Sequence, residues 1–86
     1  MSQALEAINK IKDYQQCNLS DLLLKMCHLG EPSIHKMRNG WWCKVDMHVS
    51  AKGSRFVIES DSNCDNPSEA ARQCAGRALT ILKQWS

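Results

Sequence analysis

Apolar and polar residues alternate along two neighbouring stretches in the middle of this chain, Trp41–Val49 and Ser54–Ser60. In the first stretch every odd-numbered residue is apolar, and the even-numbered residues after Trp42 are polar. A period of two residues is typical of a half-buried β-strand. We therefore predict two antiparallel strands that bury one face of a sheet and are joined by a loop at residues 50–53.

The register of this strand pair follows from the same pattern. The predicted opposite pairs are Met47 with Phe56, Val45 with Ile58 and Lys44 with Glu59. The first two pairs join apolar residues on the core face, and the third places opposite charges beside each other on the outer face. A shift by one residue would bury Lys44 and Asp46, so the pattern specifies the register strongly.

A third strand is predicted upstream, at Ser33–Arg38, because Asn39-Gly40 is a strong signal for a two-residue hairpin loop. In the type I′ conformation such a loop requires positive φ at both of its residues. The resulting opposite pairs are Ile34 with Val45 on the core face and Met37 with Trp42 on the outer face.

Three helices are predicted from apolar residues at helical spacing and from residues that favour helix ends. Their ranges are Ser2–Gln16, Asn18–Leu29 and Asn66–Gln84. Asn18 and Asn66 are the expected N-caps, and Gly30 suits the position after the second helix, where positive φ is favoured. In the last helix the centre of the apolar stripe is alanine and cysteine, so this helix can approach a sheet closely.

The predicted order is therefore α-α-β-β-β-α. It corresponds to an α+β fold in which helices cover one face of a three-stranded antiparallel sheet and leave the other face free. A chain of 86 residues can form one modest core. We assign residues 1–17 to an N-terminal helical extension and residues 18–86 to a single α+β domain.

The order α-β-β-β-α from Asn18 to about Gln84, together with the alanine-rich segment Ser68–Leu79, resembles the double-stranded RNA-binding domain. This resemblance implies that family's fold, in which lysines at the start of the last helix contact phosphates across the groove. The corresponding positions in this chain are Pro67, Ser68 and Ala71, and none of them is basic. We therefore expect a fold of this kind without its RNA-binding lysines.

The composition of the chain reduces the number of possible functions. The net charge of +2 favours neither nucleic acid nor a membrane, and no apolar run approaches the roughly 18–20 residues that span a bilayer. The start of the chain lacks the pattern of a signal peptide, so we expect a cytoplasmic protein. The five cysteines, an odd number without a C-x-x-C motif, are expected to be free thiols. No motif indicates an enzyme, a metal site or a cofactor.

The outer sheet face carries the most informative local feature, the apolar pair of Met37 and Trp42. Tryptophan is enriched at interface hot spots, and methionine adapts to irregular surfaces. The predicted partner-binding residues are Met37, Trp42, His35, Lys44, Arg55 and Glu59. Two alternatives stay open, because the N-terminal helix could fold over this face or two copies of the chain could pair through it.

We therefore expect a non-enzymatic module that binds another protein. The short chain, and its stretch Gly40–Leu79 in particular, also resembles small accessory proteins encoded by bacteriophages and prophages. That resemblance implies an inhibitor of a host complex, such as a CRISPR system or another defence system. The alternative is a degenerate nucleic-acid-binding domain, whose predicted contacts are Lys52, Arg55, Arg72 and Arg77.

Overall fold

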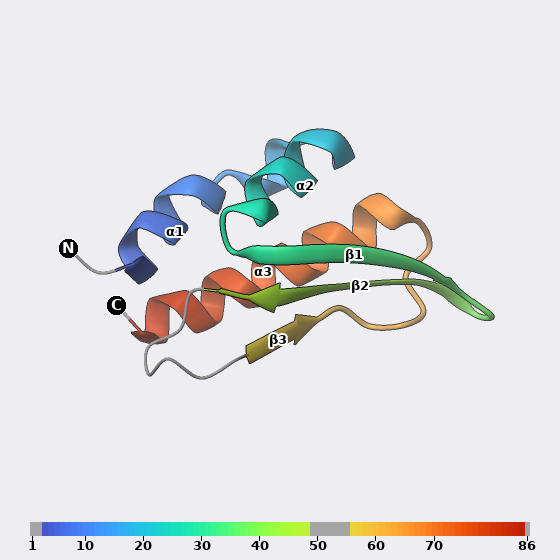
Figure 1. Ribbon diagram of the computed structural model, residues 1–86. Helices are drawn as coiled ribbons and strands as arrows, with labels where there is room; N and C mark the ends of the chain where they lie inside the picture. The colour runs from blue at the N-terminus through green and yellow to red at the C-terminus, as the bar shows by residue number, and fades with distance from the viewer. Residues whose placement is uncertain (1–2, 49–55, 86) are drawn as a thin grey trace.

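The computed structural model describes residues 3–48 and 56–85 (Figure 1). Its elements are α1 (Gln3–Ile11), a 3₁₀ turn η1 (Tyr14–Gln16), α2 (Leu19–Cys27), β1 (Gly30–Met37), β2 (Gly40–Met47), β3 (Phe56–Glu59) and α3 (Pro67–Trp85). The predicted α+β order of α-α-β-β-β-α is confirmed. Among the described residues, no helix is both long and apolar enough to cross a membrane.

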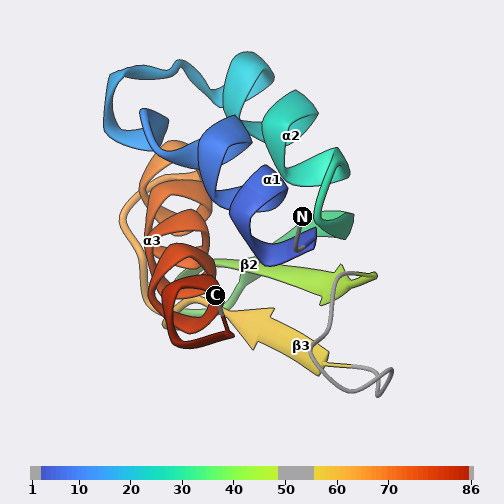
Figure 2. The same cartoon turned by 90° about the vertical axis from the view of Figure 1, so that its left-hand side faces the viewer.

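The three strands form one antiparallel sheet with β2 in the centre. Helix α3 packs against β2 and β3, helix α2 packs against β1, and α1 packs against α3 and α2. The face of the sheet that is turned towards the viewer in Figure 1 carries none of the described helices, and Figure 2 shows the helices grouped away from it. The sheet therefore has one covered face and one open face.

The predicted register between β2 and β3 is confirmed, with Met47 opposite Phe56, Val45 opposite Ile58 and Lys44 opposite Glu59. The pair extends beyond β3, since the Ser60 amide donates to the Cys43 carbonyl at 2.8 Å and the Cys43 amide donates to Ser60 Oγ at 2.9 Å. The predicted loop at residues 50–53 lies outside the described residues.

The predicted register between β1 and β2 is wrong by one position at the turn. Gly40 lies opposite Met37, so the turn residues are Arg38 and Asn39. As a result Trp42 lies opposite His35 instead of Met37. The remaining predicted pair also changes, because Ile34 lies opposite Cys43 and Pro32 lies opposite Val45.

A tertiary contact accounts for the displaced turn. A Cβ atom on Gly40 would lie 2.7 Å from Asn63 Cα, and the adjacent Trp41 exchanges backbone hydrogen bonds of 2.8 and 3.2 Å with Cys64. Glycine at position 40 therefore allows two backbone segments to approach each other closely, and its φ is +157°. No residue other than glycine has positive φ among those described, so the type I′ loop with Asn39 at positive φ is not formed.

The predicted role of Gly30 as a helix end with positive φ is also wrong. Helix α2 ends at Cys27 with His28 as its C-cap, and Gly30 is instead the first residue of β1. A Cβ atom there would overlap the Asp46 carbonyl oxygen on β2. Gly30 therefore allows the two strand backbones to approach each other, and strand β1 begins three residues earlier than the predicted Ser33.

Proline in β1 is tolerated because of its position in the ladder. The backbone of Cys43 bonds towards β3, so the neighbouring residues Trp42 and Lys44 bond towards β1 and pair with His35 and Ser33. The intervening residues of β1, Pro32 among them, direct their backbone groups to the outer edge. The missing N–H of Pro32 therefore removes no hydrogen bond from the sheet.

Both predicted asparagine caps are confirmed. Asn18 Oδ1 accepts a hydrogen bond of 2.8 Å from the Asp21 amide, and Asn66 Oδ1 accepts one of 2.8 Å from the Glu69 amide. The predicted helix Ser2–Gln16, in contrast, is divided into α1 and the short 3₁₀ turn η1.

The core lies between α3 and the covered face of the sheet and extends to α1 and α2. The small residues of α3 allow the close approach that the sequence predicts, and all of the following are fully buried: Ala71, Cys74, Ala75, Ala78 and Leu82. Helix α1 contributes Ile11 and Ala7 to the same core, with exposed fractions of 0% and 3%.

Candidate functional site: the open face of the sheet

The open face is formed by the side chains that alternate away from the helices. Its members are Glu31, Ser33, His35 and Met37 of β1, Trp42, Lys44 and Asp46 of β2, and Val57 and Glu59 of β3. Helix α1 does not cover these residues, since Ile11 is buried among the helices. The alternative in which the N-terminal helix folds over this face is therefore wrong.

Trp42 lies at the centre of a small aromatic and basic cluster on the open face. The His35 ring, on the neighbouring strand, stacks on the indole with ring centres 5.0 Å apart and an angle of 31° between the planes. The Lys44 ammonium lies 5.6 Å from the centre of the same indole. Trp42 is half-buried by these neighbours, and a cation so placed over an indole is attracted by the ring's negative face.

Met37 is part of the same face, although it is not opposite Trp42. On that face Met37 is the next residue of β1 after His35 in the direction of the turn, and 39% of its surface is exposed. The structure therefore brings His35, Met37, Trp42 and Lys44 together at the hairpin end of the open face.

The other end of the open face is acidic. Glu31 lies opposite Asp46, which lies opposite Val57, and 48% of the Val57 surface is exposed. Glu59 lies opposite Lys44 as predicted. The two side chains do not form one of the ion pairs found among the described residues, because the Lys44 ammonium is directed over the Trp42 ring. Of the predicted partner-binding residues, only Arg55 lies outside the described residues.

The predicted nucleic-acid contacts are not brought together by the described part of the fold. Lys52 and Arg55 lie outside the described residues. Arg72 donates from Nη2 to the Cys17 carbonyl at 3.3 Å, which ties α3 to the segment before α2. Arg77 donates from Nη1 to the Glu59 carbonyl at 2.7 Å. Both arginines therefore hold backbone segments of their own chain in place.

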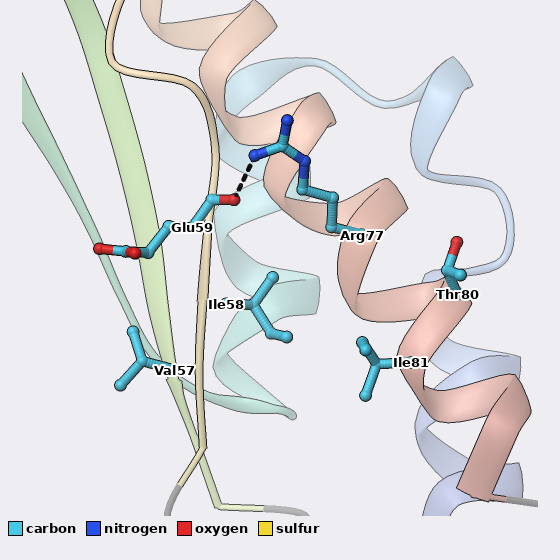
Figure 3. A pocket seen from close by; sticks show the side chains of 6 residues that line it. All are labelled: Val57, Ile58, Glu59, Arg77, Thr80 and Ile81. Atoms are coloured by element: carbon cyan, nitrogen blue, oxygen red, sulfur yellow. Dashed lines mark hydrogen bonds between the residues drawn. The ribbon is translucent and has the colours of Figure 1, made fainter.

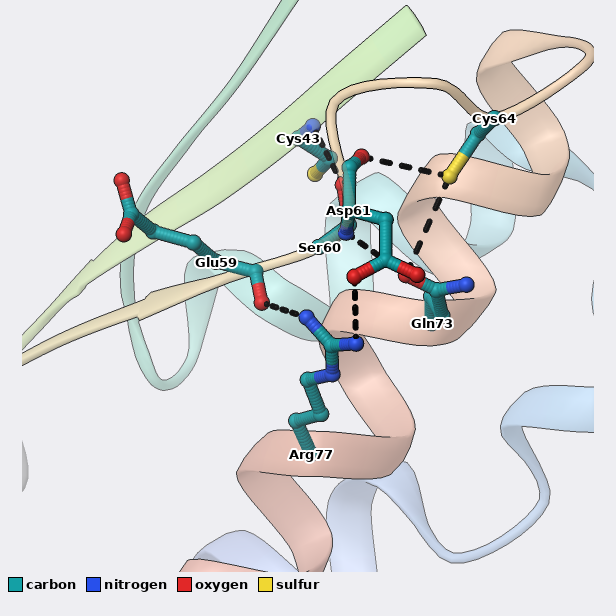
Figure 4. Close-up of polar contacts among 7 residues, drawn as sticks. All are labelled: Cys43, Glu59, Ser60, Asp61, Cys64, Gln73 and Arg77. Atoms are coloured by element: carbon teal, nitrogen blue, oxygen red, sulfur yellow. Dashed lines mark hydrogen bonds and ion pairs between the residues drawn. The ribbon is translucent and has the colours of Figure 1, made fainter.

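The Arg77 network is a feature that the sequence pattern does not reveal (Figure 4). Besides the Glu59 carbonyl, its guanidinium contacts the Asp61 carboxylate at 2.9 Å, and the Gln73 side chain accepts from the Asp61 amide at 2.7 Å. The guanidinium holds the pKa of the Asp61 carboxyl below its ordinary value. Since Asp61 and Arg77 are sixteen positions apart, no local sequence pattern indicates this pair.

A shallow groove of about 340 Å³ runs between β3 and the second half of α3 (Figure 3). It is lined by Val57, Ile58, Glu59, Arg77, Thr80 and Ile81. The hydrogen bond from Arg77 to the Glu59 carbonyl crosses its upper end in Figure 3. The groove therefore lies beside the edge of β3 and is separate from the Trp42 cluster.

All five cysteines are free thiols, and four of them are buried. Cys74 lies against Cys43 in the core, and this neighbour together with burial raises the pKa of the Cys74 thiol. A thiol that stays protonated is a poor nucleophile and a poor metal ligand. Within residues 3–48 and 56–85, no group of three or more histidine, cysteine or acidic residues is placed to hold a metal ion.

Comparisons of the chain with protein-family models, with curated proteins and with solved structures find no match. The geometry of the open face is therefore the basis on which a function can be proposed.

Proposed function

We propose that this protein is a non-enzymatic module that binds another protein through the open face of its sheet. The observation that carries the proposal is Trp42, which lies half-exposed beside His35 and Lys44 on a face that none of the described helices covers. A large amphipathic ring held in a fixed orientation loses little conformational entropy when a partner packs on it.

The residues around Trp42 support a protein as the partner. Met37 offers an adaptable apolar surface, and Ser33, Lys44 and Glu59 can form a polar rim around the aromatic centre. If the chain acts in a bacteriophage or prophage, the partner would be a host complex, such as a CRISPR system or another defence system. A small rigid domain can inhibit such a complex by steric blocking.

The test compares the wild-type protein with Trp42→Ala. Proteins captured from a cell lysate by the immobilised wild type are identified, and the affinity of the purified partner is measured by calorimetry. We expect Trp42→Ala to weaken binding by at least about 2 kcal/mol, or roughly 30-fold, because truncation of a hot-spot tryptophan leaves a poorly packed interface.

The matched control is Leu24→Ala on α2, a residue that is 66% exposed in the helical layer. Its substitution is expected to leave the affinity unchanged. Equal affinity of folded Trp42→Ala and wild type for the captured partner would refute the proposal. A partner identified as a second copy of the chain would establish the homodimer instead.

A further inference from the structure

The hairpin end of the sheet is basic, and its cations have no carboxylate partners within the described residues. From Pro32 to Val45 the chain contains Lys36, Arg38 and Lys44 but no aspartate or glutamate. The ion pairs found among the described residues join Lys25 to Asp13 and Arg77 to Asp61, so neither of them includes a cation of this end.

Two of these cations are held in place by aromatic rings. The Lys44 ammonium lies 5.6 Å from the centre of the Trp42 ring on the open face. The Lys36 ammonium lies 5.7 Å from the centre of the Trp41 ring and donates to the Met37 carbonyl at 3.0 Å. Because Trp41 and Trp42 are consecutive in β2, they point to opposite faces of the hairpin. A cation over an indole keeps its full charge and can still donate to a carboxylate.

We propose that this basic hairpin end, formed by His35, Arg38, Trp42 and Lys44, binds an acidic segment of the partner protein. The inference rests on the proposed function and gives the chemistry of the partner. Carboxylates would pair with Arg38 and Lys44, and an apolar residue of the segment would pack on the exposed Met37 beside Trp42. Since the opposite end of the open face carries Glu31 and Asp46, the charge distribution also fixes the direction of the bound segment.

A protein segment is favoured over a nucleic acid by the arrangement around Trp42. A base that stacked on this indole would compete with His35 and Lys44, which already lie over the ring. In addition, Arg72 and Arg77 are engaged with backbone carbonyls and cannot extend the basic surface.

The test uses a short peptide of glutamate and leucine, the same peptide with glutamine in place of glutamate, and a single-stranded oligothymidylate. Each is titrated into isotope-labelled protein while the indole N–H signals of the tryptophans are followed by NMR. We expect the glutamate peptide to bind at least about tenfold more tightly than the glutamine peptide and to shift the Trp42 signal.

The double variant Arg38→Gln/Lys44→Gln is expected to lose about tenfold in affinity for the glutamate peptide. The matched double variant Lys10→Gln/Lys12→Gln, at the end of α1 and just after it, makes the same change in net charge and is expected to lose less than about twofold. Equal binding of the two peptides, or tighter binding of oligothymidylate, would overturn the inference.

The same variants separate this inference from the proposed function. A captured partner whose affinity falls with Trp42→Ala but not with Arg38→Gln/Lys44→Gln would support protein binding by the open face and overturn the acidic segment. A partner whose affinity falls with neither variant would overturn both.

Discussion

Gly30 illustrates how a single residue controls the approach of two strands. Added atoms at this position would overlap the Asp46 carbonyl oxygen and lie 2.9 Å from Met47 Cα. These are backbone atoms, which cannot move without displacing strand β2 from the core. Gly76 on α3 presents a different case, because the atom closest to its missing Cβ is the Tyr14 hydroxyl at 3.0 Å, the mobile end of a side chain.

We predict that Gly30→Ala lowers the free energy of unfolding by at least about 2 kcal/mol, because the strand pair must separate to admit the methyl group. Gly76→Ala is the control. Its change should stay within about 1 kcal/mol, since the alanine gains helix propensity while Tyr14 shifts. Urea denaturation followed by tryptophan fluorescence measures both. Coincident transitions of Gly30→Ala and wild type would contradict the prediction.

The Asp61–Arg77 ion pair is the basis of a second prediction about single residues. The pKa of Asp61 is below its ordinary value of 3.8 in the folded protein because Arg77 stabilises the carboxylate. The contribution of the pair to stability is therefore fully present above the pKa of the unfolded chain and is lost as the pH falls through the folded pKa. Carbon-detected NMR titration should show the Asp61 pKa rising towards 3.8 in Arg77→Gln. An unchanged titration in that variant would exclude the guanidinium as the cause.

At the scale of elements, the strand pairs show which signals act locally and which do not. The β2–β3 register follows from alternation alone, because a shift by one residue buries charged side chains. The Asn39-Gly40 signal identifies the hairpin correctly but not its turn residues. The contact of Gly40 with Asn63 and the bridge from Trp41 to Cys64 displace the turn by one position.

The N-cap of helix α3, Asn66, is the basis of a prediction about the stability of an element. Asn66→Ala should lower the free energy of unfolding by about 1 kcal/mol, because the Glu69 amide loses its side-chain acceptor. Asn66→Ser, which keeps an acceptor oxygen, should retain most of the stability. Thermal unfolding followed by circular dichroism distinguishes the two variants. Equal losses in both would indicate that the cap is not the cause.

For the whole molecule, the position of α1 decides both the extent of the core and the accessibility of the open face. The sequence allowed this helix to lie over the outer face, where it would have covered Trp42. Instead Ile11 and Ala7 are buried with α3 in the common core. The same contact that completes the core therefore leaves the face of Trp42 uncovered.

We predict that Ile11→Ala lowers the free energy of unfolding by about 2–4 kcal/mol, through lost transfer energy and a residual cavity. Fluorescence and circular dichroism should still report a single coincident transition, because α1 shares its core with the rest of the chain. Leu24→Ala, at an exposed position, should change stability by less than about 0.5 kcal/mol. Separate transitions in Ile11→Ala would show that α1 unfolds independently.

The sequence by itself determined the element order, the two asparagine caps, the small-residue stripe of α3 and the two faces of each strand. These properties depend on spacing within a few residues, and periods of two and of about 3.6 residues are local geometry. It also identified four residues of the candidate site that lie together on the open face: His35, Met37, Trp42 and Lys44.

The tertiary structure alone decided which residue lies opposite Trp42, where the hairpin turns, why position 30 requires glycine, and that α1 packs against α3 and α2. It also brought Arg77 to Asp61 across sixteen positions of sequence. Each of these depends on the approach of segments that are distant in the chain, and backbone contacts such as Gly40 with Asn63 outweigh a local turn preference. Local pattern specifies the elements, whereas the packing between them specifies their register.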